Sequence, residues 1–289
     1  MNASALVEPA RIVEPLSWVG HVPFAMWITE MLQPCVIVEL GTHTGNSYFA
    51  FCQSVRDHAL ATRCFAVDTW QGDEHAGYYG DRVYNTVAAY NDEHYRSFSR
   101  LLRMTFDEAL SRFSDGSIDL LHIDGLHTYE AVRHDFDSWL PKMSDRGVIL
   151  FHDTTVRHAD FGVWKLWEEV SKKYPHIAFD QSHGLGVLFT GMNIDPALAA
   201  VLRDVEMKTG HAHIKTLFTD LGEQLLEQSQ IKFEQNHEKS FCERRDDISN
   251  IKIWRNGSTM LKPIRKLRKS IKKRYGKLKK AFRSLDGNG

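Results

Sequence analysis

The chain has 289 residues, 25% charged and 43% hydrophobic, which is the balance of a globular protein with one large domain or two small ones. It has no apolar run of about 18 residues, so we expect no transmembrane helix, and its start lacks the basic-then-apolar pattern of a secretory signal. No Cys-x-x-Cys spacing occurs, which favours buried reduced thiols over a disulfide framework or a zinc site; the cysteines are Cys35, Cys52, Cys64 and Cys242.

The first periodic stretch covers residues 17–32, where apolar side chains recur at helical spacing. We expect a helix that packs over the edge of a sheet beside a ligand cleft. Trp18 and His21 would either face that cleft or belong to an aromatic core, and the pattern leaves both open.

Residues 36–40 then form an apolar, β-branched run typical of a strand covered on both faces. A glycine turn follows, and a helix is expected over residues 46–56. The spacing Glu39-x-Gly41-x-x-x-Gly45 is not the dinucleotide fingerprint Gly-x-Gly-x-x-Gly. Glu39 would repel a pyrophosphate but suits a cationic, hydroxyl-rich ligand such as S-adenosylmethionine. An ordinary strand-to-helix turn is the alternative.

Residues 63–68 predict a second strand that ends at Asp68, where a carboxylate can accept the two hydroxyls of a ribose. An insertion rich in Gly, Tyr and Asp follows at residues 71–80, and residues 81–97 are expected to be helical. This region is interpreted as a cap that faces the substrate, although an ordinary packed insertion explains it equally well.

The rest of the body continues the alternation of strands and helices. Thr105 begins a helix with the capping-box spacing to Glu108. The predicted strands lie at 99–104, 117–123 and 147–151, the predicted helices at 128–140 and 160–173, and a hairpin pairs 178–179 with 186–189. The fold class is therefore α/β: a doubly wound, Rossmann-like sheet, mostly parallel, with a C-terminal antiparallel hairpin and a helical C-terminal extension.

Four strands end in acidic residues: Glu39, Asp68, Asp124 and the pair His152-Asp153. Each acid alone would be a turn or cap residue. Because parallel strands place their carboxyl ends on one edge of a sheet, we expect the four to line one pocket.

Four segments carry a family resemblance: WVGHVPF (18–24), VELGTHTG (38–45), IDLLHIDGLHTYE (118–130) and VILFHDT (148–154). Residues 17–191 resemble the class I S-adenosylmethionine-dependent methyltransferases, and are most similar to the bacterial branch found beside glycosyltransferases in surface-polysaccharide pathways. The resemblance implies S-adenosyl-L-methionine as cofactor, a sugar or glycan hydroxyl as acceptor, glycosyltransferases as partners and a cytoplasmic location.

The related macrolide-sugar O-methyltransferases imply the catalytic residues. In their pattern an Asp-x-x-His follows strand four and an acid pair follows strand five. Asp124-x-x-His127 matches the first element and implies His127 as the general base. A divalent metal, Mg²⁺ or Mn²⁺, would be held by Asp124, His152 and Asp153, although His152 replaces an acid of the relatives and suits a softer ion than an all-oxygen site. Both histidines could instead have structural roles.

The resemblance and the strand ends together define the expected cofactor-binding set. Glu39 would face the ammonium or ribose side of the donor, Asp68 the ribose, and the turn at Thr105 and Phe106 the adenine. The full set is Glu39, Gly41, Thr42, Gly45, Ser47, Asp68, Thr105, Phe106 and Asp124.

The end of the chain differs in charge from the rest. Residues 262–289 contain twelve Lys or Arg and one Asp, whereas the whole chain has a net charge of −1. An apolar stripe at helical spacing makes this a basic amphipathic helix. It is expected to bind an anionic membrane surface at the inner leaflet, with docking on the acidic body or on a partner as alternatives. No motif for reading a nucleic acid accompanies it.

The predicted organisation is a helical cap at 1–34, a methyltransferase domain at 35–192, a helical extension at 193–240, a linker at 241–261 and the basic helix at 262–289. Two other functional classes compete with an O-methyltransferase. One is a nicotinamide-dependent oxidoreductase, which the glycine spacing disfavours. The other is a non-catalytic module of the same fold that recruits glycosyltransferases at the membrane.

Overall fold

The computed structural model describes residues 7–194, 198 and 213–248, with side chains described as far as residue 237. The chain divides into two compact units, residues 4–231 and residues 1–3 with 232–289. The first unit contains the sheet and the site. Of the second, the described part is helical.

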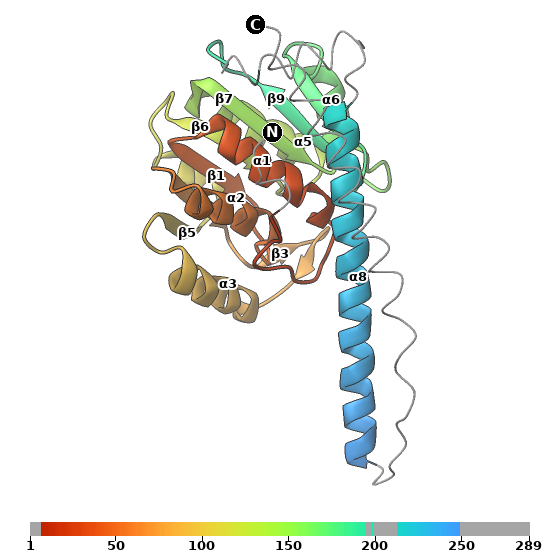
Figure 1. Cartoon of the computed structure of the whole chain (residues 1–289). Coiled ribbons are helices and arrows are strands. Elements are labelled where there is room, and N and C mark those ends of the chain that lie inside the picture. The colour runs from red at the N-terminus through yellow and green to blue at the C-terminus, as the bar shows by residue number, and fades with distance from the viewer. Residues whose placement is uncertain (1–6, 195–197, 199–212, 249–289) are drawn as a thin grey trace, which may run out of the picture. The chain divides into compact units, whose positions relative to one another are not determined.

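The elements follow one another as an alternation of strands and helices (Figure 1). The helices are η2 (Val19–His21), α1 (Val22–Leu32), α2 (Asn46–Asp57), α3 (Asp81–His94), α4 (Phe106–Leu110), α5 (Tyr129–Trp139), η3 (Leu140–Lys142), α6 (Val163–Val170) and α8 (His213–Ile248). The strands are β1 (Val36–Leu40), β2 (Arg63–Asp68), β3 (Gly72–Asp73), β4 (Gly77–Tyr78), β5 (Ser99–Arg103), β6 (Ile118–Ile123), β7 (Met143–His152), β8 (His176–Phe179) and β9 (Leu185–Phe189).

Seven strands form one sheet in the order β5-β2-β1-β6-β7-β9-β8. The first five are mutually parallel, and β9 pairs antiparallel with both β7 and β8. The sheet is therefore doubly wound and mostly parallel and ends in an antiparallel hairpin, so the predicted fold class is confirmed.

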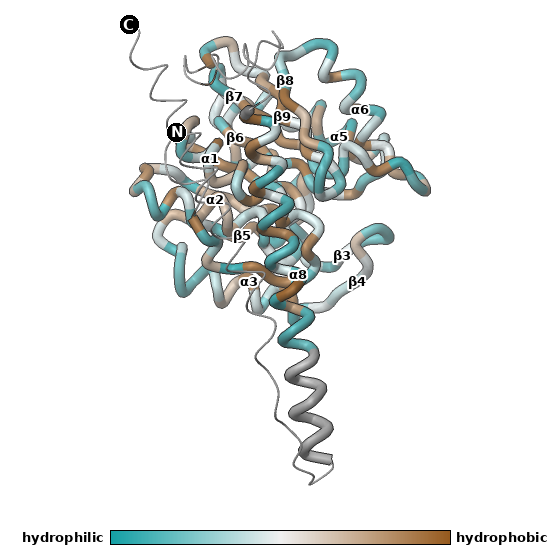
Figure 2. Tube along the Cα trace, turned by 45° about the vertical axis from the view of Figure 1, so that its right-hand side comes forward, coloured by the Kyte–Doolittle hydropathy of each residue, from teal (hydrophilic) through white to brown (hydrophobic). Residues whose placement is uncertain are grey.

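Strand β1 shows why the sheet is covered on both sides. Its side chains alternate between two faces, so Ile37 joins one hydrophobic cluster while Val36, Val38 and Leu40 join the other. Helices α1 and α2 cover the first face (Figure 1), and α4, α5 and α6 supply the helical side chains of the second cluster. The strands of this sheet form much of the hydrophobic interior of the trace in Figure 2.

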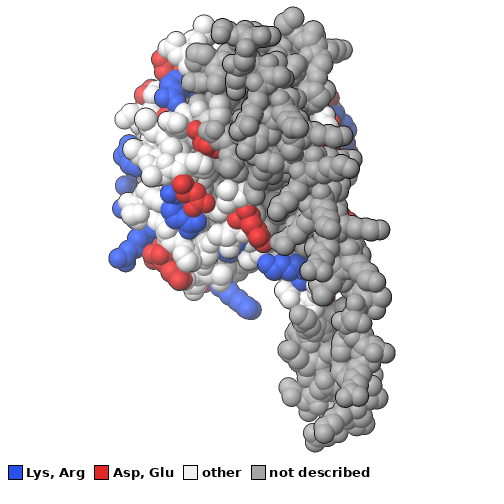
Figure 3. Space-filling view, in the orientation of Figure 1, with Lys and Arg blue, Asp and Glu red and all other residues white. Residues whose placement is uncertain are grey.

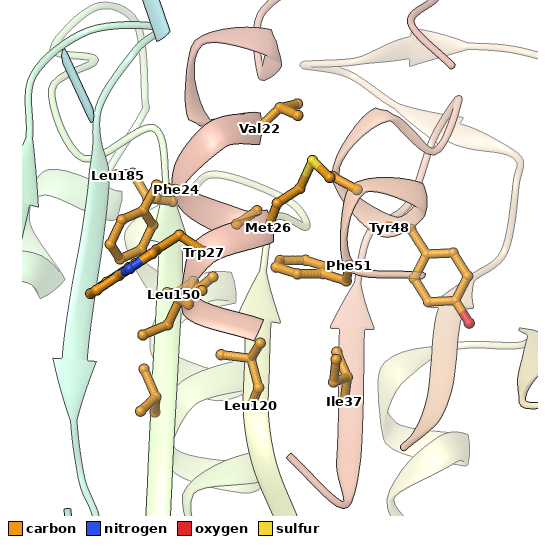
Figure 4. Packing of buried hydrophobic residues seen from close by; sticks show 14 of the residues in the cluster. Val22, Phe24, Met26, Trp27, Ile37, Tyr48, Phe51, Leu120, Leu150 and Leu185 are labelled. Carbon is orange, nitrogen blue, oxygen red and sulfur yellow. The ribbon is translucent and has the colours of Figure 1, made fainter. Parts of the chain in front are cut away.

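The first cluster is built by large side chains of α1 and α2 that lie over the middle of the sheet (Figure 4). Phe24, Met26 and Trp27 come from α1 and Phe51 from α2, and all four are at most 3% exposed. Burying side chains of this size contributes about 1.5–3 kcal/mol each. A helix does precede β1 as predicted, but it packs over the middle of the sheet and not over its edge.

Several boundaries differ from the sequence prediction. Strand β7 is longer than expected, and the insertion at 71–80 contains a small antiparallel hairpin, β3–β4, visible as a separate loop in Figure 2. Helix α8 continues to Ile248, so residues 241–248 are helical and the predicted linker does not begin at 241. The physical reason is composition: within residues 241–261, Asn, Gly and Ser occur only from residue 249 onward. The predicted basic helix at 262–289 lies outside the described residues.

Two further expectations concern the whole chain. Cys52 and Cys64 are buried free thiols and Cys35 is an exposed one, and Cys242 lies outside the described side chains. Among the described helices, none combines the length and the apolar composition needed to cross a bilayer.

Candidate active site

A cavity of about 950 Å³ opens at the carboxyl ends of the parallel strands. This is the edge where doubly wound sheets bind ligands, and the volume lies within the range of small-molecule sites. The predicted residues that line it are Gly41, Thr42, Ser47, Asp68, Thr105, Phe106, Asp124, His127, His152 and Asp153. Three of the four strand ends, Asp68, Asp124 and the pair His152-Asp153, therefore meet at one pocket, whereas Glu39 and Gly45 are not among its lining residues.

The glycine turn after β1 brings two strand ends into close contact. Gly41 has φ +86°, and a Cβ at this position would lie 2.0 Å from the carbonyl oxygen of Asp124. The Asp124 N–H also donates to Leu40 O at 2.8 Å. Only glycine combines this backbone conformation with so close an approach. Gly41 thus sets Asp124 directly beside the turn.

Asp68 holds the same turn from the end of β2. Its Oδ2 accepts the backbone N–H groups of Thr42 at 2.8 Å and His43 at 2.9 Å, and its Oδ1 accepts that of Trp70 at 2.6 Å. The carboxylate lies at the cavity wall, as predicted. Its bonding partners in this structure are backbone amides, which gives it a structural role in shaping the turn.

Glu39 lies away from the cavity. Its side chain is fully buried, and its Oε2 accepts a hydrogen bond from His122 Nδ1 at 2.8 Å. Trp18 Nε1 donates to His122 Nε2 at 3.1 Å, which fixes the hydrogen of His122 on Nδ1. Burial raises the pKa of Glu39, and the bond from His122 opposes this rise. The other oxygen of Glu39, Oε1, is buried and has no hydrogen-bond partner within the described residues.

The sequence left open whether Trp18 and His21 face the cleft or belong to an aromatic core. Trp18 lines the cavity, so it does face the cleft. His21 is fully buried, does not line the cavity, and lies 3.2 Å through Nε2 from the carbonyl oxygen of Ser182, so it is a core histidine. His122 has no role in the sequence prediction because nothing in its strand pattern distinguishes it from a core residue.

Four charged or ionisable groups converge at the ends of β6 and β7. His127 Nε2 lies 2.9 Å from Asp153 Oδ2 and 3.5 Å from Asp124 Oδ1. His152 Nδ1 lies 3.2 Å from the same Asp124 oxygen and 3.5 Å from the same Asp153 oxygen. Asp153 has φ +60°, a left-handed conformation that is rare outside glycine and that occurs more often at functional sites.

The electrostatics follow from this geometry. Burial would raise the pKa of Asp124 and of Asp153, but the neighbouring His152 and His127 outweigh it and lower both values. Burial likewise would lower the pKa of His127, but the hydrogen bonds to Asp124 and Asp153 raise it to about 9. Without another cation, these carboxylates therefore keep His127 protonated at neutral pH.

The donor set fits a divalent metal. Asp124, His152 and Asp153 each offer one ligand atom, and these atoms lie within 4.8 Å of one another. His152 Nε2 lies 3.0 Å from Ser182 O and so must carry a hydrogen, and Nδ1 faces the two carboxylates, which raise the pKa of His152. Nδ1 would bind a metal ion once its own hydrogen is displaced. Two carboxylate oxygens and one imidazole nitrogen suit Mn²⁺ or a similar ion.

His127 is held by several segments. Its ring lies almost parallel to Phe161, with centroids 4.8 Å apart and an interplanar angle of 4°, and its carbonyl oxygen accepts the Gly162 N–H at 2.7 Å. Its Nδ1 is buried with no hydrogen-bond partner among the described residues. Thr128 caps helix α5, which starts immediately after it. The imidazole is thus fixed beside the cavity.

Thr105 and Phe106 form the wall next to α4. The Thr105 side chain accepts the Glu108 N–H at 3.3 Å, and Glu108 Oε2 accepts the Thr105 N–H at 2.8 Å, so the predicted capping box is confirmed. The Phe106 ring lies against Gly125, where a Cβ would be 2.5 Å from it. Any larger residue at 125 would displace this wall.

The tertiary structure adds site residues that the sequence analysis does not identify. His75 and Tyr79 come from the insertion at 71–80, which the pattern identifies only as a cap. His183 lies in the turn before β9, with Nδ1 3.3 Å from Asp153 Oδ1. Asp160 forms, with Glu74 and His75, a second group of metal-type ligands, of which His75 lines the cavity. Single His residues in loops carry no spacing signal that would identify them.

The comparisons with known proteins agree with this arrangement. Residues 38–154 match the family model of a methyltransferase domain, Methyltransf_24. Over 187 residues, 65% of this chain, the sequence is 55% identical to the uncharacterized protein y4gI of Sinorhizobium fredii. That alignment covers 20% of y4gI, so the chain spans about a fifth of the length of this relative.

Solved structures with a similar chain trace have low sequence identity. A candidate caffeoyl-CoA O-methyltransferase from Staphylococcus aureus has TM-score 0.47 and 14% identity, with 63% of this chain and 86% of that chain covered. TomG, an O-methyltransferase from Streptomyces achromogenes in complex with SAM, has TM-score 0.44 and 14% identity, with 63% and 92% covered. Cofactor-bound Rv0187 from MTB has TM-score 0.46 and 12% identity, with 65% and 85% covered.

The family match begins within β1 and ends just after His152 and Asp153, and so it includes the glycine turn and every strand end that lines the cavity. Residues 38–154 are therefore similar to a methyltransferase domain over the part of the chain that forms the cavity.

Proposed function

We propose that this chain is an S-adenosylmethionine-dependent O-methyltransferase that acts on a hydroxyl group of a sugar. The observation that carries the proposal is the juxtaposition of His127 with Asp153 and Asp124 in the same cavity as the glycine turn. A base beside an acceptor position and a turn suited to a donor are the two parts that methyl transfer to an alcohol requires.

The donor half of the cavity suits a nucleoside that carries no phosphate. The carboxylates of Asp68 and Asp124 line the cavity beside the turn and would repel a pyrophosphate. We assign Asp68 to the ribose and the Thr105–Phe106 wall to the adenine. Glu39 is buried beside His122 and does not line the cavity, so any effect on the donor would be indirect.

The acceptor half is assigned to His127. An alcohol is a poor nucleophile until its proton is removed, and a positioned base typically contributes ~10²–10⁴-fold to the rate. The hydroxyl proton passes to His127 while the acceptor oxygen bonds to the methyl carbon. The carbon–sulfur bond breaks, its electron pair returns to sulfur, and S-adenosylhomocysteine leaves. Holding both reactants in line supplies a further ~7–11 kcal/mol in favourable cases.

His127 can act as a base at neutral pH only if another positive charge binds the carboxylates that keep it protonated. With Asp124 and Asp153 free, the pKa of His127 is about 9, which is too high for a base at neutral pH. Asp124, His152 and Asp153 would hold a divalent metal, Mg²⁺ or Mn²⁺, which would supply a charge that lowers the pKa of a bound hydroxyl. As metal ligands, the two carboxylates would no longer hold a proton on His127.

The acceptor class and the cellular setting rest on the family resemblance. We assign a sugar of a surface polysaccharide or its precursor as acceptor, glycosyltransferases as partners, and residues 262–289 as a segment for an anionic membrane surface. Basic and acidic side chains are interspersed on the described surface visible in Figure 3, so that face shows no uniform basic patch of the kind that binds nucleic acid.

The test has two steps. Calorimetry with S-adenosylmethionine measures donor binding, and incubation of the protein, donor and a cell extract followed by mass spectrometry identifies a product heavier by one methyl group. Absence of donor binding at millimolar concentration would end the proposal. Donor binding with no methylated product, and a pathway unaffected by His127→Ala, would favour a non-catalytic role.

A further inference from the structure

The β3–β4 hairpin contributes one histidine to the site. The His75 side chain is 7% exposed, although it stands in a short surface hairpin. Its ring stacks on Phe161, with centroids 4.5 Å apart at 28°, and on His127, 5.4 Å apart at 29°. A ring cluster of His75, Phe161 and His127 therefore joins three segments that follow β2, β6 and β7.

Hydrogen bonds set the orientation of His75 within this cluster. The backbone N–H of His127 donates to His75 Nδ1 at 3.4 Å, so this nitrogen must be unprotonated. The hydrogen is then on Nε2, which donates to Asp160 Oδ1 at 2.9 Å. The backbone N–H of His75 donates to Asp73 Oδ1 at 2.7 Å and fixes the hairpin turn. One chain of bonds thus runs from Asp160 through the His75 ring to the backbone of His127.

The same backbone is held on its other side. The carbonyl oxygen of His127 accepts the Gly162 N–H at 2.7 Å, and the ring is directed at Asp153. The peptide groups on both sides of the His127 Cα are therefore anchored, one by the segment after β7 and one by the hairpin. Releasing the hairpin contact frees the peptide before His127 to rotate, which moves the imidazole.

We infer that His75 is a positioning residue: it accepts the backbone N–H of His127 and so couples the β3–β4 hairpin to the orientation of the general base. This inference rests on the proposed function. The hairpin also lines the mouth of the cavity, so an acceptor that contacts the hairpin acts on the base through His75. Misplacing a reacting group by about 1 Å can cost on the order of 10²-fold in rate.

Two conservative variants separate the hydrogen bond from the ring. In His75→Asn the side-chain oxygen lies close to the position of Nδ1 and can still accept the His127 N–H. In His75→Gln the amide nitrogen reaches Asp160 as Nε2 does, but no acceptor remains at the Nδ1 position. Both remove the aromatic ring, so they share any loss that comes from stacking alone.

The expected kinetic result is a difference between the two. His75→Gln should lower kcat by about 10–100-fold, with the affinity for S-adenosylmethionine unchanged by calorimetry, and His75→Asn should retain kcat to within about threefold. Equal losses in both variants would overturn the inference, because the ring or the hairpin fold alone would then account for the effect. Melting temperatures of both variants identify a general loss of structure.

Amide hydrogen exchange supplies a readout that does not depend on catalysis. The His127 amide should exchange at least about tenfold faster in His75→Gln than in the unmodified protein, and at a near-normal rate in His75→Asn. His134→Gln, a change at a half-exposed histidine of α5, is the matched control. Unchanged exchange in His75→Gln would refute the contact. If the protein methylates nothing, the proposed function fails, whereas the exchange rates still decide whether His75 holds His127.

Discussion

His127 Nε2 lies 2.9 Å from Asp153 Oδ2, and this ion pair is the shortest contact between the proposed base and the proposed metal ligands. The same carboxylate oxygen also faces His152 Nδ1 at 3.5 Å. A proton on His127 and a metal ion on Asp153 therefore compete for one oxygen.

The first prediction concerns the pKa of His127. Burial lowers it, but the bonds to Asp124 and Asp153 outweigh burial, so NMR titration of the metal-free protein should give a value of about 9. Asp153→Asn should lower the value, because one carboxylate is lost. A raised folded-state pKa stabilises the fold below the unfolded value of ~6.5, and this contribution is lost as pH rises through about 9. A value at or below ~6.5 in the metal-free protein would contradict this account.

The second prediction concerns metal binding. Calorimetry should detect Mn²⁺ binding that releases protons, because the cation displaces the proton held by these carboxylates. Asp124→Asn and His152→Ala should each weaken it by at least the ~10–100-fold typical of losing a supporting residue. Glu74→Gln changes the second, exposed ligand group at the cavity mouth and is the matched control. Loss of Mn²⁺ binding in Glu74→Gln, with binding by Asp124→Asn unaffected, would show that the metal site is the group of Glu74, His75 and Asp160.

The third prediction concerns the base. His127→Ala and His127→Gln should lower kcat by ~10²–10⁴-fold, because the acceptor hydroxyl then loses its proton to water alone. Donor affinity should not change, since His127 lies on the acceptor side. His134→Ala, at an exposed histidine of the following helix, should leave kcat as it was. Retained activity in both His127 variants would remove His127 from the mechanism.

The fourth prediction concerns the glycine turn. Gly41→Ala places a Cβ 2.0 Å from the backbone oxygen of Asp124 at φ +86°, so the turn must open. We expect a loss of unfolding free energy well above the ~1–2 kcal/mol that a left-handed alanine costs, and loss of donor binding. Gly116→Ala has φ +70° with open space around its Cβ and reports the conformational cost alone. Urea unfolding of the two variants should therefore differ; similar losses would show that close approach is unimportant.

The fifth prediction concerns Asp135 of α5, a carboxyl that is 7% exposed. Burial raises its pKa to about 7, an effect that His134 partly offsets. The folded state then binds a proton that the unfolded state releases above pH ~4, so stability falls as pH rises from ~4 to about 7. Asp135→Asn mimics the neutral acid and should be more stable than the unmodified protein at pH 8, by roughly 2–4 kcal/mol, and equal to it near pH 4. Equal stability at both pH values would contradict this assignment.

The sequence alone determined the sheet and the edge where the site lies. Apolar runs that end in Glu39, Asp68, Asp124 and Asp153 specify parallel strands, and the carboxyl ends of such strands share one edge whatever the loops do. The capping box at Thr105 was equally readable, because its two partners are three residues apart. Local spacing and strand periodicity are sufficient for features of this kind.

Only the tertiary structure decided which way individual side chains point. Glu39 turns inward because it accepts a hydrogen bond from His122, which is 83 residues away in the sequence. Trp18, 104 residues from His122, donates to the other ring nitrogen of that histidine. His75 reaches His127 across 52 residues and depends on the fold of a hairpin that has no strong pattern of its own. Such contacts arise from packing between distant segments and from the choice of rotamer, and neither leaves a periodic signal in the sequence.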